Sequence, residues 1–168
     1  MCGCAGLSPD QEQEKRLEID AMSKATLATF AEQHPDAADA FERSLGYAVV
    51  DMKVTKVPVF GAGSGLGVVF DKRNDARTYV KVSRFEVGGG LGVQAFKAIV
   101  LLHDPVLLDR AMKGAWHFDA GMEAAAGGTS AEGKVSTADK GYQAFKIAEG
   151  GVVATLTVRM IRAQPYLD

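Results

Sequence analysis

The residues of this chain best suited to acid–base or metal chemistry are its three histidines. His34 precedes a proline, His103 precedes Asp104, and His117 follows Trp116. None stands four residues from a second ligand type, as the paired ligands of a helical zinc site do, so the spacing predicts no metal. Asp104 and His117 could form an acid–base pair, but the sequence favours it over no other His/Asp pair. We therefore predict that the protein is not an enzyme and needs no cofactor.

The glycine clusters could belong to a nucleophile elbow or to a nucleotide-binding loop, but their spacing fits neither motif. A nucleophile elbow around Ser64 would need glycines at positions 62 and 66, where the chain has Ala62 and Leu66. A dinucleotide-binding loop would need a third glycine at Leu66 or Val93, and no Lys-Ser or Lys-Thr follows either cluster as a phosphate loop requires. The sequence predicts no nucleotide site.

The glycines instead alternate with other residues, as they would along one face of a β-strand. A bare strand face costs chain entropy, and it is tolerated where a helix, another strand or a ligand must come very close. We expect this close-packing role for two sets: Gly61, Gly63, Gly65 and Gly67, and Gly88, Gly90 and Gly92.

The elements that position these residues divide into helices and strands. Ser8 and Pro9 predict the start of a helix that runs to about Gln33, and Pro35 opens a second one that ends at Gly46. We expect the first helix to bury the stripe Ile19, Met22, Thr26 and Phe30. Alternation predicts strands over residues 47–54, 57–70, 78–87 and 89–102, with a turn at 71–75.

The second half contains one more helix, which begins after the cap Asp104 and ends at Gly114. Strands follow over residues 118–126, 141–148 and 150–162, the last two joined by a hairpin at 149–151, and residues 127–140 read as a loop. The predicted fold is α+β: N-terminal helices packed on a glycine-rich, mainly antiparallel β-sheet, which could be barrel-like, with one inserted short helix.

Composition and charge limit the function classes. The 168 residues are 47% hydrophobic and 24% charged, which suits one domain with a real core. A net charge of -2 argues against a nucleic-acid partner, yet residues 44–117 hold ten Lys/Arg and six Asp/Glu, so an anionic ligand would sit there.

The N-terminus carries the only cysteines, Cys2 and Cys4, followed by small and then polar residues. This is how the mature start of a bacterial lipoprotein reads, so we expect residues 1–9 to act as a tether, with Cys4 or alternatively Cys2 lipidated, and residues 10–168 to form one domain. No signal peptide precedes the cysteines, and no apolar run approaches the ~20 residues that span a bilayer.

Several stretches occur in the order found in one known family. They are SLGYAVV at 44–50, GAGSGLGVV at 61–69, GGGLGVQAFK at 88–97, WHFDA at 116–120 and KIAEGGV at 146–152. Over about residues 44–162 the chain resembles the SYLF lipid-binding domain, in its bacterial lipoprotein-type members. The resemblance implies a non-catalytic domain that binds membrane phospholipid through basic residues, here anionic lipid at the bacterial cell envelope or periplasm.

Strand alternation places Arg77 and Lys81 on one face, beside the turn that holds Lys72 and Arg73, and these four are the first choice for head-group contact. The wider set of candidate cations adds Lys53, Lys56, Arg84 and Lys97. The alternative is a structural or partner-binding envelope protein or a homo-oligomer, whose glycine faces pack against protein and which binds no lipid.

Overall fold

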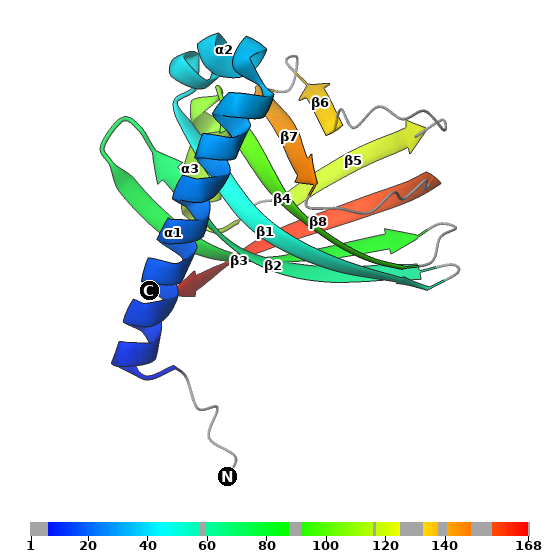
Figure 1. Ribbon diagram of the computed structural model, residues 1–168, viewed down its shortest axis with the longest axis horizontal. Helices are drawn as coiled ribbons and strands as arrows, with labels where there is room; N and C mark the ends of the chain where they lie inside the picture. The colour runs from blue at the N-terminus through cyan, green and yellow to red at the C-terminus, as the bar shows by residue number, and fades with distance from the viewer. Residues whose placement is uncertain are drawn as a thin grey trace.

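A computed structural model gives the fold and describes residues 7–57, 60–87, 92–115, 117–124, 133–137, 141–148 and 156–167. Helices come first in the chain and strands follow (Figure 1). The elements are α1 (Pro9–Gln33), the 3-10 turn η1 (Pro35–Ala37), α2 (Ala38–Arg43), β1 (Gly46–Val57), β2 (Phe60–Asp71), β3 (Ala76–Val87), β4 (Gly92–Leu102), α3 (Pro105–Met112), β5 (His117–Ala124), β6 (Gly133–Thr137), β7 (Tyr142–Ala148) and β8 (Leu156–Leu167).

The strands form one eight-stranded sheet in the order β5-β8-β3-β2-β1-β4-β7-β6, and every neighbouring pair is antiparallel. The predicted α+β class is therefore confirmed. The barrel-like variant of that prediction is wrong, because β5 and β6 are the two edges of the described sheet and are not paired with each other. The sheet curves strongly but stays open (Figure 1).

Helices cover both faces of this sheet. On the outer face, α1 and η1 bury Phe30 and Ala37 against Val49, Ile99 and other apolar side chains of β1, β4 and β7. On the inner face, α3 buries Leu108 and Ala111 in a second core with side chains of β1 to β4 and β8. Alternating residues of β1 and β4 thus enter two separate cores, as the period of two requires.

The long helix α1 begins as its sequence predicts. The Ser8 hydroxyl accepts a hydrogen bond from the Gln11 backbone N–H, and the Gln11 side chain accepts one from the Ser8 backbone, which forms a capping box. The predicted stripe is confirmed, because Ile19, Thr26 and Phe30 are buried and Met22 is half-buried. One face of α1 is thereby fixed on the sheet.

The expected stop at Gly46 is wrong. Helix α2 already ends at Arg43, and Gly46 is the first residue of β1. Its backbone approaches both Phe70 and α3, where an added Cβ would lie 2.7 Å from a Leu108 side-chain carbon. Gly46 is therefore needed for close packing and not for a left-handed turn.

Helix α3 follows its predicted limits. The Asp104 carboxylate accepts hydrogen bonds from the backbone N–H groups of Val106 and Leu107, and Gly114 ends the helix with a positive φ of 63°. The Asp104 cap and the Gly114 stop are confirmed, and together they place α3 under the inner face.

The C-terminal part differs from expectation in two ways. Strand β6 lies within the stretch 127–140 that was predicted to be a loop, and β7 and β8 do not form a hairpin. Instead β7 pairs with β4 while β8 pairs with β3, so four strands separate them. Local turn composition at 149–151 suggested a hairpin, but the long-range pairing of β8 overrides it.

Candidate functional site

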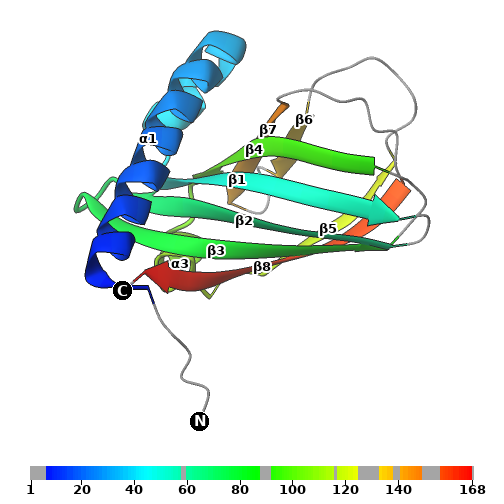
Figure 2. The ribbon, with the colours of Figure 1, turned by 60° about the horizontal axis from the view of Figure 1, so that its bottom comes forward.

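The outer face of the sheet is only half covered. Helix α1 crosses β1 to β4 near one end, and the opposite ends of these strands extend past it (Figure 2). We call the part beyond α1 the distal outer face. From the tip inwards its residues are Phe60; then Val93, Thr55, Ala62 and Phe85; then Ala95, Lys53, Ser64, Ser83 and Arg162; then Lys97, Asp51, Lys81 and Gln164.

The tip of the distal outer face is apolar and accessible. Phe60 is 46% exposed, Phe85 49% and Val93 61%, and the rings of Phe60 and Phe85 lie 6.4 Å apart. Large apolar side chains that gather in this way on a surface usually mark a contact with a partner or a membrane.

Cations stand behind this tip. Lys53 and Lys81 are exposed on β1 and β3, Arg162 is exposed on β8, and Lys97 is half-buried on β4. Among the described residues in the two rows that hold these cations, Asp51 is the one carboxylate. Two residues along a strand span about 6.6 Å, so the cations begin one such step behind the apolar tip. The surface can therefore place apolar groups in a bilayer and positive charge at the level of its head groups.

Three of the four cations chosen first from the sequence lie elsewhere and already have partners. Lys72 donates to backbone carbonyl oxygens of α2, and Arg73 forms ion pairs with Asp71 and Asp109. Arg77 forms an ion pair with Asp20 on α1 at 3.0 Å, away from the tip, and its side chain stays half-exposed. Alternation does put Arg77 and Lys81 on one face as predicted, but Arg77 stands beside α1 and pairs with its Asp20, so the structure does not bring the four into one surface.

The wider set of predicted cations is also divided. Lys53 and Lys97 belong to the distal outer face with Lys81. Arg84 is buried on the inner face, where its guanidinium lies 5.1 Å from the centre of the Phe96 ring. Lys56 stands in β1 opposite Gly61 and Gly92.

The glycines of β2 point to the inner face and allow close packing there. Gly63 and Gly65 pair with Val54 and Met52, whose side chains lie over the bare glycine backbone. A Cβ on Gly63 would lie 2.6 Å from a Val54 methyl carbon, and one on Gly65 would lie 2.5 Å from the Met52 sulfur. Gly61 and Gly67 share that face. The close packing expected of Gly92 is wrong: nothing lies within 4 Å of a Cβ added there, and its φ of 133° is what favours glycine at the start of β4. Gly88 and Gly90 are outside the described residues, as are Cys2 and Cys4.

Comparison with known proteins gives one weak relative. The chain is similar to beta cell expansion factor A of Aeromonas veronii. The two are 24% identical over 147 residues, which are 88% of this chain and 56% of the relative. The chain thus spans little more than half the length of that protein. No family model matches the chain.

The described residues offer little for metal chemistry. Among them no three His, Cys, Asp or Glu side chains come together in a group that could hold a metal ion. The His34 ring packs against Phe30 and Phe145 at 5.5 and 5.2 Å, so it is part of the outer core. No described helix has the length and apolar character needed to cross a membrane.

Sequence reasoning missed Arg162 and the apolar tip. Phe60 and Phe85 lie at strand ends, where an aromatic residue reads as an ordinary strand former. The alternation of side chains between the two faces of the sheet could have found them. Pairing β2 and β3 about the turn at 72–75 puts Phe60, Phe85 and Lys81 on one face. Arg162 could not be found in this way, since its strand pairs with β3 from far along the chain.

Proposed function

We propose that this chain is a SYLF-type, non-catalytic domain that binds anionic phospholipid through its distal outer face. The observation that carries the proposal is the exposed pair Phe60 and Phe85 at the tip, with Lys53, Lys81 and Arg162 directly behind it. Aromatic rings favour the bilayer interface, and each cation near an anionic surface adds on the order of 1 kcal/mol.

The family assignment is supported by the order of the five motifs over residues 44–162 and agrees with the α+β fold. The proposed location rests on the N-terminal cysteines. We propose that Cys4, or alternatively Cys2, is lipidated and holds the protein at a membrane of the bacterial envelope.

The test is co-sedimentation of residues 7–168 with vesicles of phosphatidylglycerol or of phosphatidylcholine. We expect pelleting with the anionic vesicles only, and weaker pelleting at 1 M salt, where the Debye length falls to about 3 Å. The triple variant Lys53→Gln, Lys81→Gln, Arg162→Gln should bind on the order of 100-fold more weakly, at about 1 kcal/mol per charge.

The matched control removes the same charge elsewhere. Arg43, Arg110 and Lys113 are exposed on or beside α2 and α3, away from the distal outer face. Their triple replacement by glutamine should leave vesicle binding within about twofold. Equal weakening by both triples would indicate net charge alone, and absence of binding to either vesicle would favour the alternative, a structural or partner-binding envelope protein.

A further inference from the structure

A second candidate site lies under α1, on the covered half of the outer face. It is a cleft of about 310 Å³ between α1 and strands β1 to β3. Its size is at the lower end of small-ligand sites. The polar lining is Asp20, Ser23, Lys24, Tyr47 and Arg77. None of these residues belongs to the distal outer face.

The carboxylate in this cleft is held in a fixed position. Asp20 Oδ2 accepts a hydrogen bond from Arg77 Nη1 at 3.0 Å and another from the Tyr79 hydroxyl at 3.1 Å. Burial, and then the bond to Asp20, raise the pKa of Tyr79, so its hydroxyl keeps its proton at neutral pH. A carboxylate can accept more than two hydrogen bonds, so Asp20 can also accept one from a hydroxyl group that enters the cleft.

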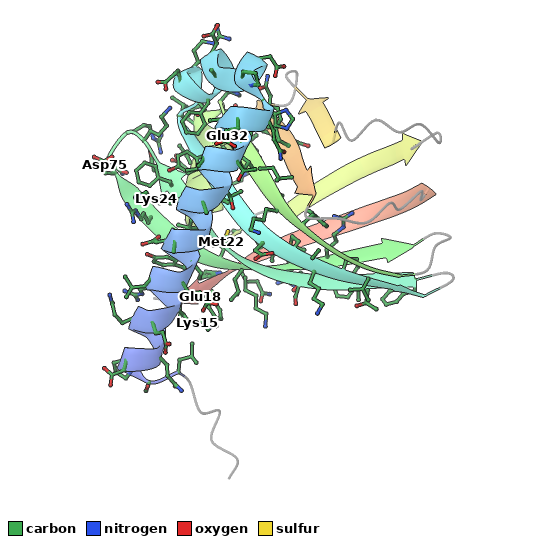
Figure 3. The ribbon with its side chains drawn as sticks, viewed as in Figure 1. Lys15, Glu18, Met22, Lys24, Glu32 and Asp75 are labelled. Carbon is green, nitrogen blue, oxygen red and sulfur yellow. The ribbon has the colours of Figure 1, made fainter. Side chains whose placement is uncertain are left out.

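Cations stand on both walls of the cleft. Arg77 projects from β3, is half-exposed, and lies 5.5 Å from the centre of the Phe70 ring. Lys24 is exposed one helical turn after Asp20, on the same side of α1 as the β2–β3 turn with Asp75 (Figure 3). Two positive charges therefore flank one carboxylate.

The floor is apolar and aromatic. The Tyr47 and Phe70 rings stack at 5.3 Å, and Leu27 and Val68 complete the lining. Burial raises the pKa of Tyr47, so its hydroxyl is also a neutral donor. A ligand with a short carbon skeleton can lie on this floor while its polar groups meet the walls.

We propose that this cleft binds a small organic phosphate that carries hydroxyl groups. The cleft is lined by a lysine from α1 and an arginine from β3. Cations on two walls suit a tetrahedral oxyanion better than a planar carboxylate, which one arginine fork can bind. The phosphate lies between Lys24 and Arg77, and a hydroxyl donates to Asp20. A free glycerol phosphate and the phosphoglycerol head group of a lipid share this chemistry.

The test is a two-dimensional NMR titration of residues 7–168 with sn-glycerol 3-phosphate, with glycerol as the uncharged probe. We expect saturable shifts at Ser23, Tyr47 and Phe70 with the phosphate and none with glycerol. Lys24→Gln should weaken binding at least tenfold. Lys15→Gln, on the same helix but paired with Glu18 instead of facing the cleft, should leave it unchanged (Figure 3).

Two comparisons complete the design. Tyr47→Phe should weaken binding severalfold without altering the fold, because it removes only the hydroxyl. Lysophosphatidylglycerol, tested below its micelle concentration, distinguishes a free phosphate ligand from a lipid head group. An affinity equal to that of sn-glycerol 3-phosphate indicates the free phosphate, and an affinity at least tenfold higher indicates the lipid head group.

The idea is overturned if no saturable shifts occur around the cleft, or if Lys15→Gln and Lys24→Gln weaken binding equally. The soluble probe needs no vesicle, so this result is independent of the distal outer face. The variant Lys53→Gln, Lys81→Gln should bind the probe like the wild type, even where it no longer pellets with vesicles.

Discussion

Lys72 Nζ donates a hydrogen bond to the carbonyl oxygen of Phe41 at 2.8 Å and lies 4.8 Å from the centre of that residue's ring. The contact joins the turn after β2 to the last turn of α2, where a cation meets the negative end of the helix. A lysine that reads as a head-group ligand in the sequence thus secures the helical segment to the sheet.

We expect Lys72→Gln to lower the free energy of unfolding by about 1 kcal/mol, because it removes a charged donor from the α2 carbonyls. Vesicle binding should change by less than twofold, since this side chain is not on the distal outer face. Urea denaturation and co-sedimentation measure the two effects. Lys113→Gln is the control for stability. A large loss of vesicle binding in Lys72→Gln would show that the turn after β2 is part of the lipid-binding surface.

The apolar tip should carry the part of membrane binding that salt does not screen. In the double variant Phe60→Ser, Phe85→Ser, we expect vesicle binding at 0.1 M salt to fall at least tenfold and residual binding at 1 M salt to disappear. Val106→Ser, an exposed apolar residue on α3, is the matched control. Unchanged high-salt binding in the double variant would show that the tip stays outside the bilayer.

The buried Asp71 should make the protein sensitive to acid. Hydrogen bonds from the Arg73 side chain, more than any other interaction, hold the pKa of Asp71 below its usual value of 3.8. A carboxyl whose pKa is lowered by folding stabilises the fold above the unfolded value and loses that contribution as the pH falls through the folded value. Unfolding free energy should therefore drop below about pH 4, and less steeply in Asp71→Asn, as urea titrations between pH 2.5 and 6 would measure. Equal slopes would contradict this role.

His103 should add a second pH dependence, nearer neutrality. Burial, and more weakly the charges of Arg43 and Lys72, lower the pKa of His103 from 6.5. The unfolded chain then takes up the proton first, so stability is complete above pH 6.5 and declines as the pH falls. We expect His103→Asn to flatten the stability profile between pH 5 and 7, measured by urea unfolding. A profile that stays as steep in His103→Asn would exclude this residue.

Gly65 tests the close-packing role of the glycines. An added methyl group would meet the Asp51 carbonyl oxygen and the Met52 sulfur, so we expect Gly65→Ala to destabilise the fold by about 1–3 kcal/mol. Ser64→Ala, one residue away on the exposed face, should change stability by no more than about 0.5 kcal/mol. Thermal unfolding of the two variants gives the comparison, and equal melting temperatures would refute the packing argument.

The first half of the fold was predictable because its signals are local. The capping box at Ser8, the Asp104 cap and the alternation along β1 to β4 each depend on a few neighbouring residues. The failures involve contacts between distant segments. Gly46 fits a helix stop and close packing equally well, and only the approach of Leu108 decides between them.

The candidate site was predictable only in part, for the same reason. Alternation placed Lys81 and Arg77 on one face of their strand, but it could not show that Arg77 would pair with Asp20 of α1 while Lys81 lies beyond that helix. Nor could it show that Asp71 and Asp109 would bind Arg73. Whether a charged residue is available to a ligand can be decided only when its partners from other elements are known.

The position of β8 also governs when the sheet can be completed. Its partner β3 is made about seventy residues earlier, and β8 is the neighbour that covers β3 on the side away from β2. Until β8 is synthesised, that side of β3 is an unpaired edge, and pairing across so long a stretch is slow to form. The newly made chain is therefore most prone to aggregate after β3 has been synthesised and before β8 has been. Slowing translation just before β8 should lower the soluble yield more than slowing translation after β8.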